Sequence, residues 1–279
     1  MTTSACTHRQ GGANGSPSPE SVPTQAGTIY VALGANPLNA QIYRFNGPAQ
    51  AGAKLTSLPP NEGASTVSAA GHFIVIASTV GFGRDRPYLL NGRGGMTNLW
   101  SRAGYAPVVS PRGDVAWLDL TMNNRGATSY GIDLLRRGDR HPMVVRHGPA
   151  GVGPAAWAGD NTLAILQAGS PARVLLIDAA TRHVLQALST DIENPTYLTA
   201  SVQRVVATGD THQGELISSS GKRTRLAQGW GPVAFSPDGT ELLVVRNRTE
   251  LGIVQVDHPD RVSLWRSWPG QTVLDAAWS

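Results

Sequence analysis

The sequence predicts an all-β fold, and three observations support this prediction. Gly (32) and Pro (19) are plentiful among the 279 residues, and only 15% of the residues are charged. Such a composition suits many short strands joined by tight turns better than long helices. In addition, the segment "PVAFSPDGTELLVV" at 232–245 places a Ser-Pro-Asp-Gly turn between two apolar runs, which is the pattern of a β-hairpin.

This hairpin pattern recurs along the chain. Aligned on Phe235, the residue before the serine, six segments match at intervals of 37 to 48 residues. One four-stranded propeller blade takes about 40–45 residues, so the spacing indicates a β-propeller. The aligned positions are Val67, Val109, Trp157, Leu198, Phe235 and Trp278.

Each hairpin is followed by a third strand that ends in a turn former, and then by a short fourth strand. The second strands are, in chain order, "HFIVIAS", "VAWLDL", "LAIL", "RVVAT" and "ELLVV". The third strands that follow them are "YLLNGRG", "YGIDLLRRG", "VLLIDAATRH", "ELISSSGK" and "GIVQVDHPD". The middle strands are apolar on both faces, as blades that stack face to face require. Trp157 and Trp278 are interpreted as packing between blades, and Asp114 and Asp238 as turn residues.

The last unit stops at Ser279 after one strand, and its missing strands lie at the other end of the chain. "GTIYVAL", "AQIYRFNG" and "AKLTSL", within 27–57, supply the second, third and fourth strands. We therefore expect 272–278 to pair with 27–33 and to close the ring, which removes open sheet edges. The prediction is one domain over 27–279, a six-bladed β-propeller with four-stranded antiparallel blades.

These residues resemble the WD-like repeat of TolB-type six-bladed propellers. In that repeat, an apolar residue and Ser-Pro-Asp-Gly precede a strand, a second strand ending in Asp, and a third. "FSPDG" is a full match and "VSPRG" a near one, whereas "WAGDN", "LTASV" and "VSAAG" depart from the pattern. The resemblance covers about residues 27–279 and implies the fold. No Asp-box of the sialidase class is present.

Residues 1–26 have a different composition, rich in Ser, Thr, Gly, Pro and Gln, and are expected to form a disordered tail or tether. "TSAC" before this stretch resembles the lipidation box of bacterial lipoproteins, in which Cys6 would carry the lipid. Thr3 stands where that box has Leu, and the sequence shows no signal-peptide pattern. A cytoplasmic location is therefore favoured over an extracytoplasmic one, with a lipid on Cys6 as the alternative. Of the 23 basic residues 21 are Arg, which is typical of GC-rich bacterial genomes.

The charge of the chain favours neither nucleic acid nor membrane as a partner. The formal net charge is only +4, from 23 basic and 19 acidic residues spread over the chain. The clusters at Arg136, Arg137 and Arg140 and at 222–225 are interpreted as solvated hairpin tips. No stretch reaches the roughly 18 apolar residues of a membrane span.

Binding residues are expected on one face of the ring. In propellers, ligands commonly meet the loops that lead into the innermost strands and the loops that join the second and third strands. On that face the sequence predicts a cluster of arginines, a cationic mouth that suits carboxylate or phosphate groups. In the alternative interpretation, Asp85 and Glu250 neutralise the charges of the neighbouring arginines. The predicted binding residues are Arg84, Arg86, Arg125, Arg246 and Arg248, with Tyr105 and Trp230 as aromatic anchors or half-buried packing.

A catalytic site has weaker support in the sequence. Asp191, Asp210 and His212 fall on neighbouring loops, where carboxylates and histidine could act as acid and base. The histidines lack the spacing of a zinc site and Cys6 is the single cysteine, so neither a metal nor a cofactor is predicted.

The leading hypothesis is a non-catalytic propeller that binds a protein or peptide partner through this face. The alternative is a small-molecule hydrolase, lyase or isomerase that uses carboxylates or histidine at the channel mouth. A purely structural module with no small ligand is a third possibility.

Overall fold

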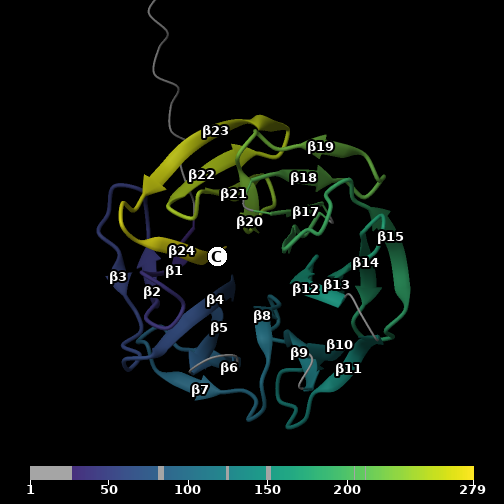
Figure 1. Ribbon diagram of the computed structural model, residues 1–279, viewed down its shortest axis with the longest axis horizontal. Coiled ribbons are helices and arrows are strands. Elements are labelled where there is room, and N and C mark those ends of the chain that lie inside the picture. Colours follow the sequence, from purple (N-terminus) through teal and green to yellow (C-terminus); the bar gives the residue numbers. More distant parts are fainter. Residues whose placement is uncertain (1–26, 81–84, 124–125, 149–151, 204, 211) are drawn as a thin grey trace, which may run out of the picture.

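The chain folds into a ring of six β-sheets. The structure, a computed structural model, describes residues 27–80, 85–123, 126–148, 152–203, 205–210 and 212–279. In these residues, six four-stranded antiparallel sheets are arranged as blades around a central axis (Figure 1). The predicted six-bladed β-propeller is thus confirmed. No helix in this part of the chain is long and apolar enough to cross a membrane.

Each blade has its innermost strand next to the axis and three further strands outside it, in that order. The ring-closing blade contains β24 (Thr272–Trp278), β1 (Ile29–Gly34), β2 (Gln41–Phe45) and β3 (Ala53–Lys54). Next along the chain come β4 (Glu62–Ala70), β5 (Phe73–Val80), β6 (Asp85–Leu90) and β7 (Met96–Asn98). The third blade contains β8 (Tyr105–Val109), β9 (Val115–Asn123), β10 (Gly126–Leu135) and β11 (Met143–Gly148). The fourth contains β12 (Val152–Trp157), β13 (Thr162–Gln167), β14 (Arg173–Asp178) and β15 (Val184–Ser189). The fifth contains β16 (Tyr197–Ala200), β17 (Val206–Gly209), β18 (Gly214–Ile217) and β19 (Arg223–Arg225). The sixth contains β20 (Gly231–Phe235), β21 (Glu241–Arg246), β22 (Glu250–Gln255) and β23 (His258–Ser267).

The ring closes where the sequence predicts. Strand β24 pairs antiparallel with β1, from Ile29 opposite Trp278 to Gly34 opposite Thr272, with a bulge between Ala32 and Leu33. Beyond this ladder, the amide of Thr28 donates to the carbonyl of Ser279 at 2.7 Å. In Figure 1 the C-terminal strand lies beside the first strand and ends near the axis. Both ends of the described chain therefore belong to one sheet.

Apolar side chains between neighbouring blades form the core. Middle strands such as β13 and β21 are buried along almost their whole length, because both of their faces meet another blade. Trp157 is 8% exposed, and its Nε1 donates to the carbonyl of Val108 in the preceding blade at 3.2 Å. Trp278 is 3% exposed and packs among Ile29, Val31 and residues of the sixth blade. The predicted packing role of both tryptophans is confirmed.

Two segments that the sequence places in long loops are mostly strand. Residues 121–129 are expected to join the second and third strands, but β9 continues to Asn123 and β10 begins at Gly126. Residues 79–87 likewise contain the end of β5 and the start of β6.

Candidate functional site

A cavity of about 450 Å³ lies on the propeller axis. Its wall is formed by the six innermost strands, which turn an unpaired edge toward the axis (Figure 1). The lining also includes the turns between the innermost and second strands, with the exposed residues Gly71, Pro111, Val202 and Pro237. Of the loops that lead into the innermost strands it includes only Thr196, as far as the described residues go. The cavity therefore opens toward the side of those turns, which we call the hairpin-turn face.

The opposite side of the ring carries the loops in which the sequence predicts binding residues, and we call it the loop face. The sequence analysis places the binding site on the loop face only because propellers commonly bind ligands through these loops. The cavity has its mouth on the other side, and Tyr197 lies at its inner end, toward the loop face. The geometry thus offers a site that the sequence analysis did not consider.

Asp275, on β24, is the only acidic or basic side chain among the described residues that line the cavity. One carboxylate oxygen accepts from the backbone N–H of Val67 on β4 at 3.0 Å, and the other accepts from the backbone N–H of Ala276 at 2.9 Å. Asp275 as a residue is half-buried among the innermost strands, and it lines the cavity. Burial raises the pKa of Asp275 to about 7, although the two N–H donors favour the charged form.

Tyr197, the first residue of β16, lies at the inner end of the cavity. Burial, and then the nearby Asp275, raise the pKa of the Tyr197 phenol, whereas Arg248 lowers it by its charge and a side-chain hydrogen bond. Arg248 belongs to the β21–β22 hairpin on the loop face, where it and Asn247 have positive φ angles of 53° and 52°. These two angles are those of a type I′ turn, and the carbonyl of Arg248 accepts from the amide of Val273 on β24 at 2.7 Å. Tyr197 therefore lies at the inner end of the cavity, with Arg248 hydrogen-bonded behind it.

Thr66, on β4, is a second polar residue of the cavity wall and precedes Val67, whose amide binds Asp275. Its Oγ1 is buried, and within the described residues it has no hydrogen-bond partner.

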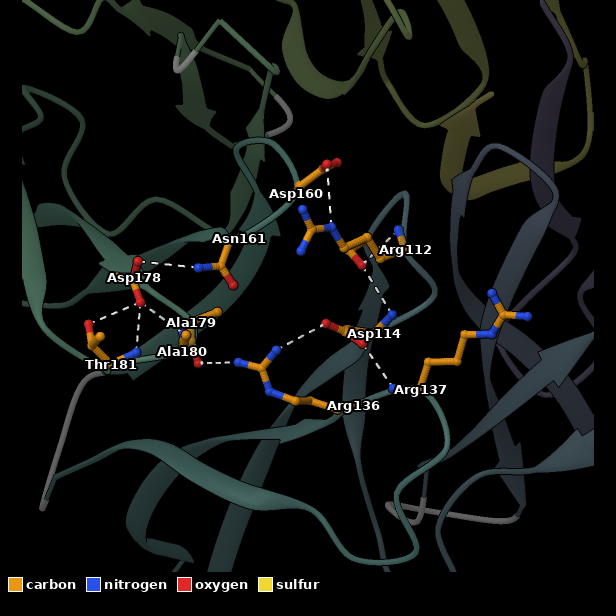
Figure 2. A network of polar contacts seen from close by, with 11 residues as sticks. Arg112, Asp114, Arg136, Arg137, Asp160, Asn161, Asp178, Ala179, Ala180 and Thr181 are labelled. Atoms are coloured by element: carbon orange, nitrogen blue, oxygen red, sulfur yellow. Dashed lines mark hydrogen bonds and ion pairs between the residues drawn. The ribbon is translucent and has the colours of Figure 1, made fainter.

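Polar contacts connect neighbouring turns around the mouth (Figure 2). Arg112, in the β8–β9 turn, forms an ion pair of 3.4 Å with Asp160 of the β12–β13 turn. Farther out, Arg136 lies 3.6 Å from Asp114 and donates to the carbonyl of Ala179 in the next blade at 3.1 Å. Arg136 is therefore a bridge between blades, in contrast to the solvated hairpin tip that the sequence indicates. These contacts keep the rim of the cavity in a fixed shape.

The predicted cationic residues do not form one cluster in the described part of the chain. Arg84 and Arg125 lie outside the described residues. Arg246 pairs with Glu250, Nε to Oε2 at 2.6 Å, as the alternative interpretation expects. Arg86 is half-buried opposite Ser78 on β5, and none of the ion pairs among the described residues includes it. Arg248 is exposed and binds Tyr197 as described above.

The two predicted aromatic anchors are both covered to some degree. Trp230 is 5% exposed, and the guanidinium of Arg246 lies 4.5 Å from the centre of its ring. Its ring is thus used for packing inside the molecule, which is the alternative that the sequence analysis gives to an aromatic anchor. Tyr105 is half-buried at the start of β8, opposite Leu118. A binding role for either residue stays a prediction.

The three catalytic candidates have separate surroundings. Asp191 pairs with Arg223 on the outermost strand β19, away from the axis. Asp210 accepts from the backbone N–H groups of His212 and Gln213 at 2.7 and 2.9 Å. Burial opposes ionisation of Asp210, but these hydrogen bonds outweigh it and lower its pKa. His212 is exposed. None of the three lines the cavity, and their catalytic role stays untested.

The side chains with acid–base or hydroxyl chemistry on the described wall of the cavity are those of Asp275, Tyr197 and several Ser and Thr residues. Across the described ranges, no group of three His, Cys, Asp or Glu side chains gathers as a metal site requires. Sequence reasoning missed Asp275, although a signal is present. An aspartate in the otherwise apolar segment "TVLDAAWS" is unusual for a strand next to the axis.

These features define a class of protein, a six-bladed propeller with an axial cavity that contains one acidic side chain. Among solved structures, the chain is similar to the crystal structure of TolB from Acinetobacter baumannii, with a TM-score of 0.70 and 17% sequence identity. The similarity covers 90% of this chain and 66% of that one, a little under two thirds. No protein-family model and no curated protein matches the sequence. The comparison thus supports the TolB-type propeller fold expected from the repeats, and at this identity it shows the fold alone.

Proposed function

We propose that this chain is a non-catalytic propeller that binds a polypeptide partner at the hairpin-turn face, with part of the partner inside the axial cavity. The observation that carries the proposal is the cavity itself. Its volume of about 450 Å³ falls within the roughly 300–1,000 Å³ of known ligand sites. The sequence hypothesis of a protein or peptide partner is kept, and the binding face is changed from the loop face to the hairpin-turn face.

The rim of the cavity has the composition of a polypeptide-binding surface. Val202 is 52% exposed, and the exposed Pro111 and Pro237 lie on the same rim. Exposed apolar groups that surround a hollow are typical of interaction sites. The turns that carry them are fixed by contacts such as that between Gln203 Nε2 and the carbonyl of Asp238, at 3.3 Å. A rigid rim reduces the entropy that is lost on binding.

A test begins with a random peptide library displayed on phage and selected on the immobilised protein. We then expect Val202→Arg to weaken binding of the selected peptides at least about tenfold, because a charged side chain would crowd the mouth. Val144→Arg is the matched control, since Val144 is 51% exposed on the outermost strand β11. Equal affinities for the two variants, or no selected peptide, would overturn the proposal.

A second candidate, the enzyme, has one observation in its favour. A carboxyl group with a pKa near 7 suits general acid–base catalysis at neutral pH, and Asp275 is such a group. Nitrophenyl esters and glycosides can serve as a first panel of substrates. Turnover by the wild type that is lost in Asp275→Asn would favour the enzyme over the binding protein.

A further inference from the structure

We propose that the axial cavity binds a primary ammonium group, supplied by a lysine side chain of the polypeptide partner, at Asp275. This inference rests on the proposed function and names the chemical group that the cavity recognises. It is carried by the position of Asp275, the one Asp or Glu side chain on the described wall of the cavity, and by the two backbone N–H groups that fix its carboxylate.

The carboxylate of Asp275 has unused capacity to accept hydrogen bonds. Each of its oxygens accepts one backbone N–H, from Val67 or from Ala276. An ionised carboxylate offers about four acceptor positions, so about two remain. The backbone donors hold the carboxylate in one orientation, and Asp275 lines the cavity. A donor that enters the cavity therefore meets a fixed acceptor.

The chemistry of the carboxylate sets the preference for a donor. An ammonium group has three N–H donors and no acceptor, which matches a carboxylate with open acceptor positions. A metal ion matches less well, because hard cations require about six oxygen ligands and Asp275 is the one Asp or Glu side chain on the described wall.

The charged groups near Asp275 leave its charge uncompensated. On the facing element β16 the titratable group is Tyr197, and behind it lie Arg248 of the β21–β22 hairpin and Asp210 of the β17–β18 loop. Arg248 is engaged with the Tyr197 phenol and does not line the cavity. From β4 the amide of Val67 donates to the carboxylate, and Ala32 lies opposite Asp275 on β1. A cation that enters the cavity would thus meet no other cation on the described lining to repel it.

The source of the ammonium group follows from the shape and lining of the site. The mouth is wide and surrounded by apolar and small residues, which a free amine would leave uncovered. A lysine carries its charge at the end of an apolar chain of four carbons, so the chain can contact the wall while the charge meets Asp275. We therefore assign the group to a lysine of the partner.

The test uses N-acetyl-lysine N-methylamide as the probe, with the norleucine analogue as its neutral control of similar size. Isothermal titration calorimetry at pH 8 is expected to show at least about tenfold tighter binding of the lysine probe. Asp275→Asn should abolish this difference. Asp160→Asn is the matched control, because Asp160 is an exposed acid on the same face and does not line the cavity. Circular dichroism checks that each variant is folded.

The affinity for the probe should depend on pH in one direction. The ligand requires the ionised carboxylate, and burial raises the pKa of Asp275 to about 7. At pH 6 only about one carboxyl group in ten is ionised, so binding should be about tenfold weaker than at pH 8. The pH dependence should be absent in Asp275→Asn.

Each outcome decides between the two proposals. Selected peptides that bind without lysine, and equally well to Asp275→Asn, would overturn the ammonium site and leave the proposed function intact. If the lysine probe binds but the library yields no binding peptide, the proposal that the ammonium group comes from a polypeptide would be overturned. Loss of probe binding on addition of calcium chloride, at constant ionic strength, would identify the cavity as a metal site and overturn the inference. Equal binding of the lysine and norleucine probes would also overturn it.

Discussion

The carboxylate of Asp275 accepts a hydrogen bond of 3.0 Å from the backbone N–H of Val67, although 208 residues separate the two along the chain. This contact joins β24, the strand that closes the ring, to the innermost strand of the next blade. The Ser68 hydroxyl makes a similar contact one blade farther on, where it accepts from the Val109 amide at 3.1 Å. Closure of the ring therefore involves the axis as well as the β1–β24 ladder, and Asp275 belongs to both the scaffold and the cavity.

This dual role of Asp275 gives a prediction about stability and pH. Its pKa in the folded state is about 7 because of burial, against 3.8 for an ordinary aspartate. Between these values the unfolded chain has released the proton and the folded chain retains it. The free energy of unfolding should thus fall as the pH rises from about 4 to 7, and should level off above 7. Urea unfolding at several pH values measures this change.

Asp275→Asn should remove much of that decrease, because the amide is neutral in both states. Relative to the wild type, the variant should become more stable as the pH rises. Asp133 is a useful comparison, since burial and then Asp119 raise its pKa to about 6, while His147 opposes the shift. Asp133→Asn should alter the profile only up to about pH 6. Parallel profiles for the wild type and Asp275→Asn would show that the carboxyl group is not titrating in this range.

The contacts between the third and fourth blades give a second prediction. Asp114 is 8% exposed, accepts from the Arg137 amide at 2.9 Å and pairs with Arg136. Asp114→Ala should lower the free energy of unfolding by about 1–3 kcal/mol, because it leaves a half-buried guanidinium and a backbone donor without their acceptor. Arg112→Ala removes an exposed ion pair and should change it by less than about 1 kcal/mol. Denaturant unfolding measures both changes. Similar losses of unfolding free energy in the two variants would contradict the structural role assigned to Asp114 among the contacts of Figure 2.

The stacking of Arg246 on Trp230 gives a third prediction. Arg246→Ala should cost about 1 kcal/mol of stability, because it uncovers an indole ring and breaks the pair with Glu250. Arg140→Ala, at an exposed hairpin, should be neutral within about 0.5 kcal/mol. Arg246→Ala should also leave the affinity for selected peptides unchanged. A large loss of affinity without loss of stability would restore Arg246 to the binding role that the sequence suggests.

The fold was predictable because the turn residues within each repeat and the pairing of the two chain ends indicate the same architecture. In the turn after Phe235, Asp238 accepts hydrogen bonds from the Ser236 hydroxyl and the Thr240 amide, and Gly239 has a φ of 76°. The chemistry of this turn is thus contained in a few neighbouring residues, and the repeat places a turn at the matching position of the other blades, although its residues differ there. The pairing of 272–278 with the start of the chain followed from counting strands.

The candidate site was less predictable because it depends on contacts between distant segments. Nothing near Arg246 in the sequence indicates that Trp230 lies beneath its guanidinium. The sequence also does not show on which side the axial space is open, since that depends on how the innermost strands of all the blades are arranged around the axis. Asp275 was visible as an exception in an apolar strand, yet its meaning required knowing that β24 lies next to the axis.

The central claim is that a polypeptide binds at the hairpin-turn face, and photo-crosslinking tests it most directly. A benzoylphenylalanine is placed at position 202, on the rim of the cavity, or at position 247, in the exposed β21–β22 hairpin of the loop face. A labelled peptide selected from the library is then irradiated with each protein. We expect a covalent adduct from position 202 and none from position 247. An adduct from position 247 alone would contradict the account and return the binding site to the loop face.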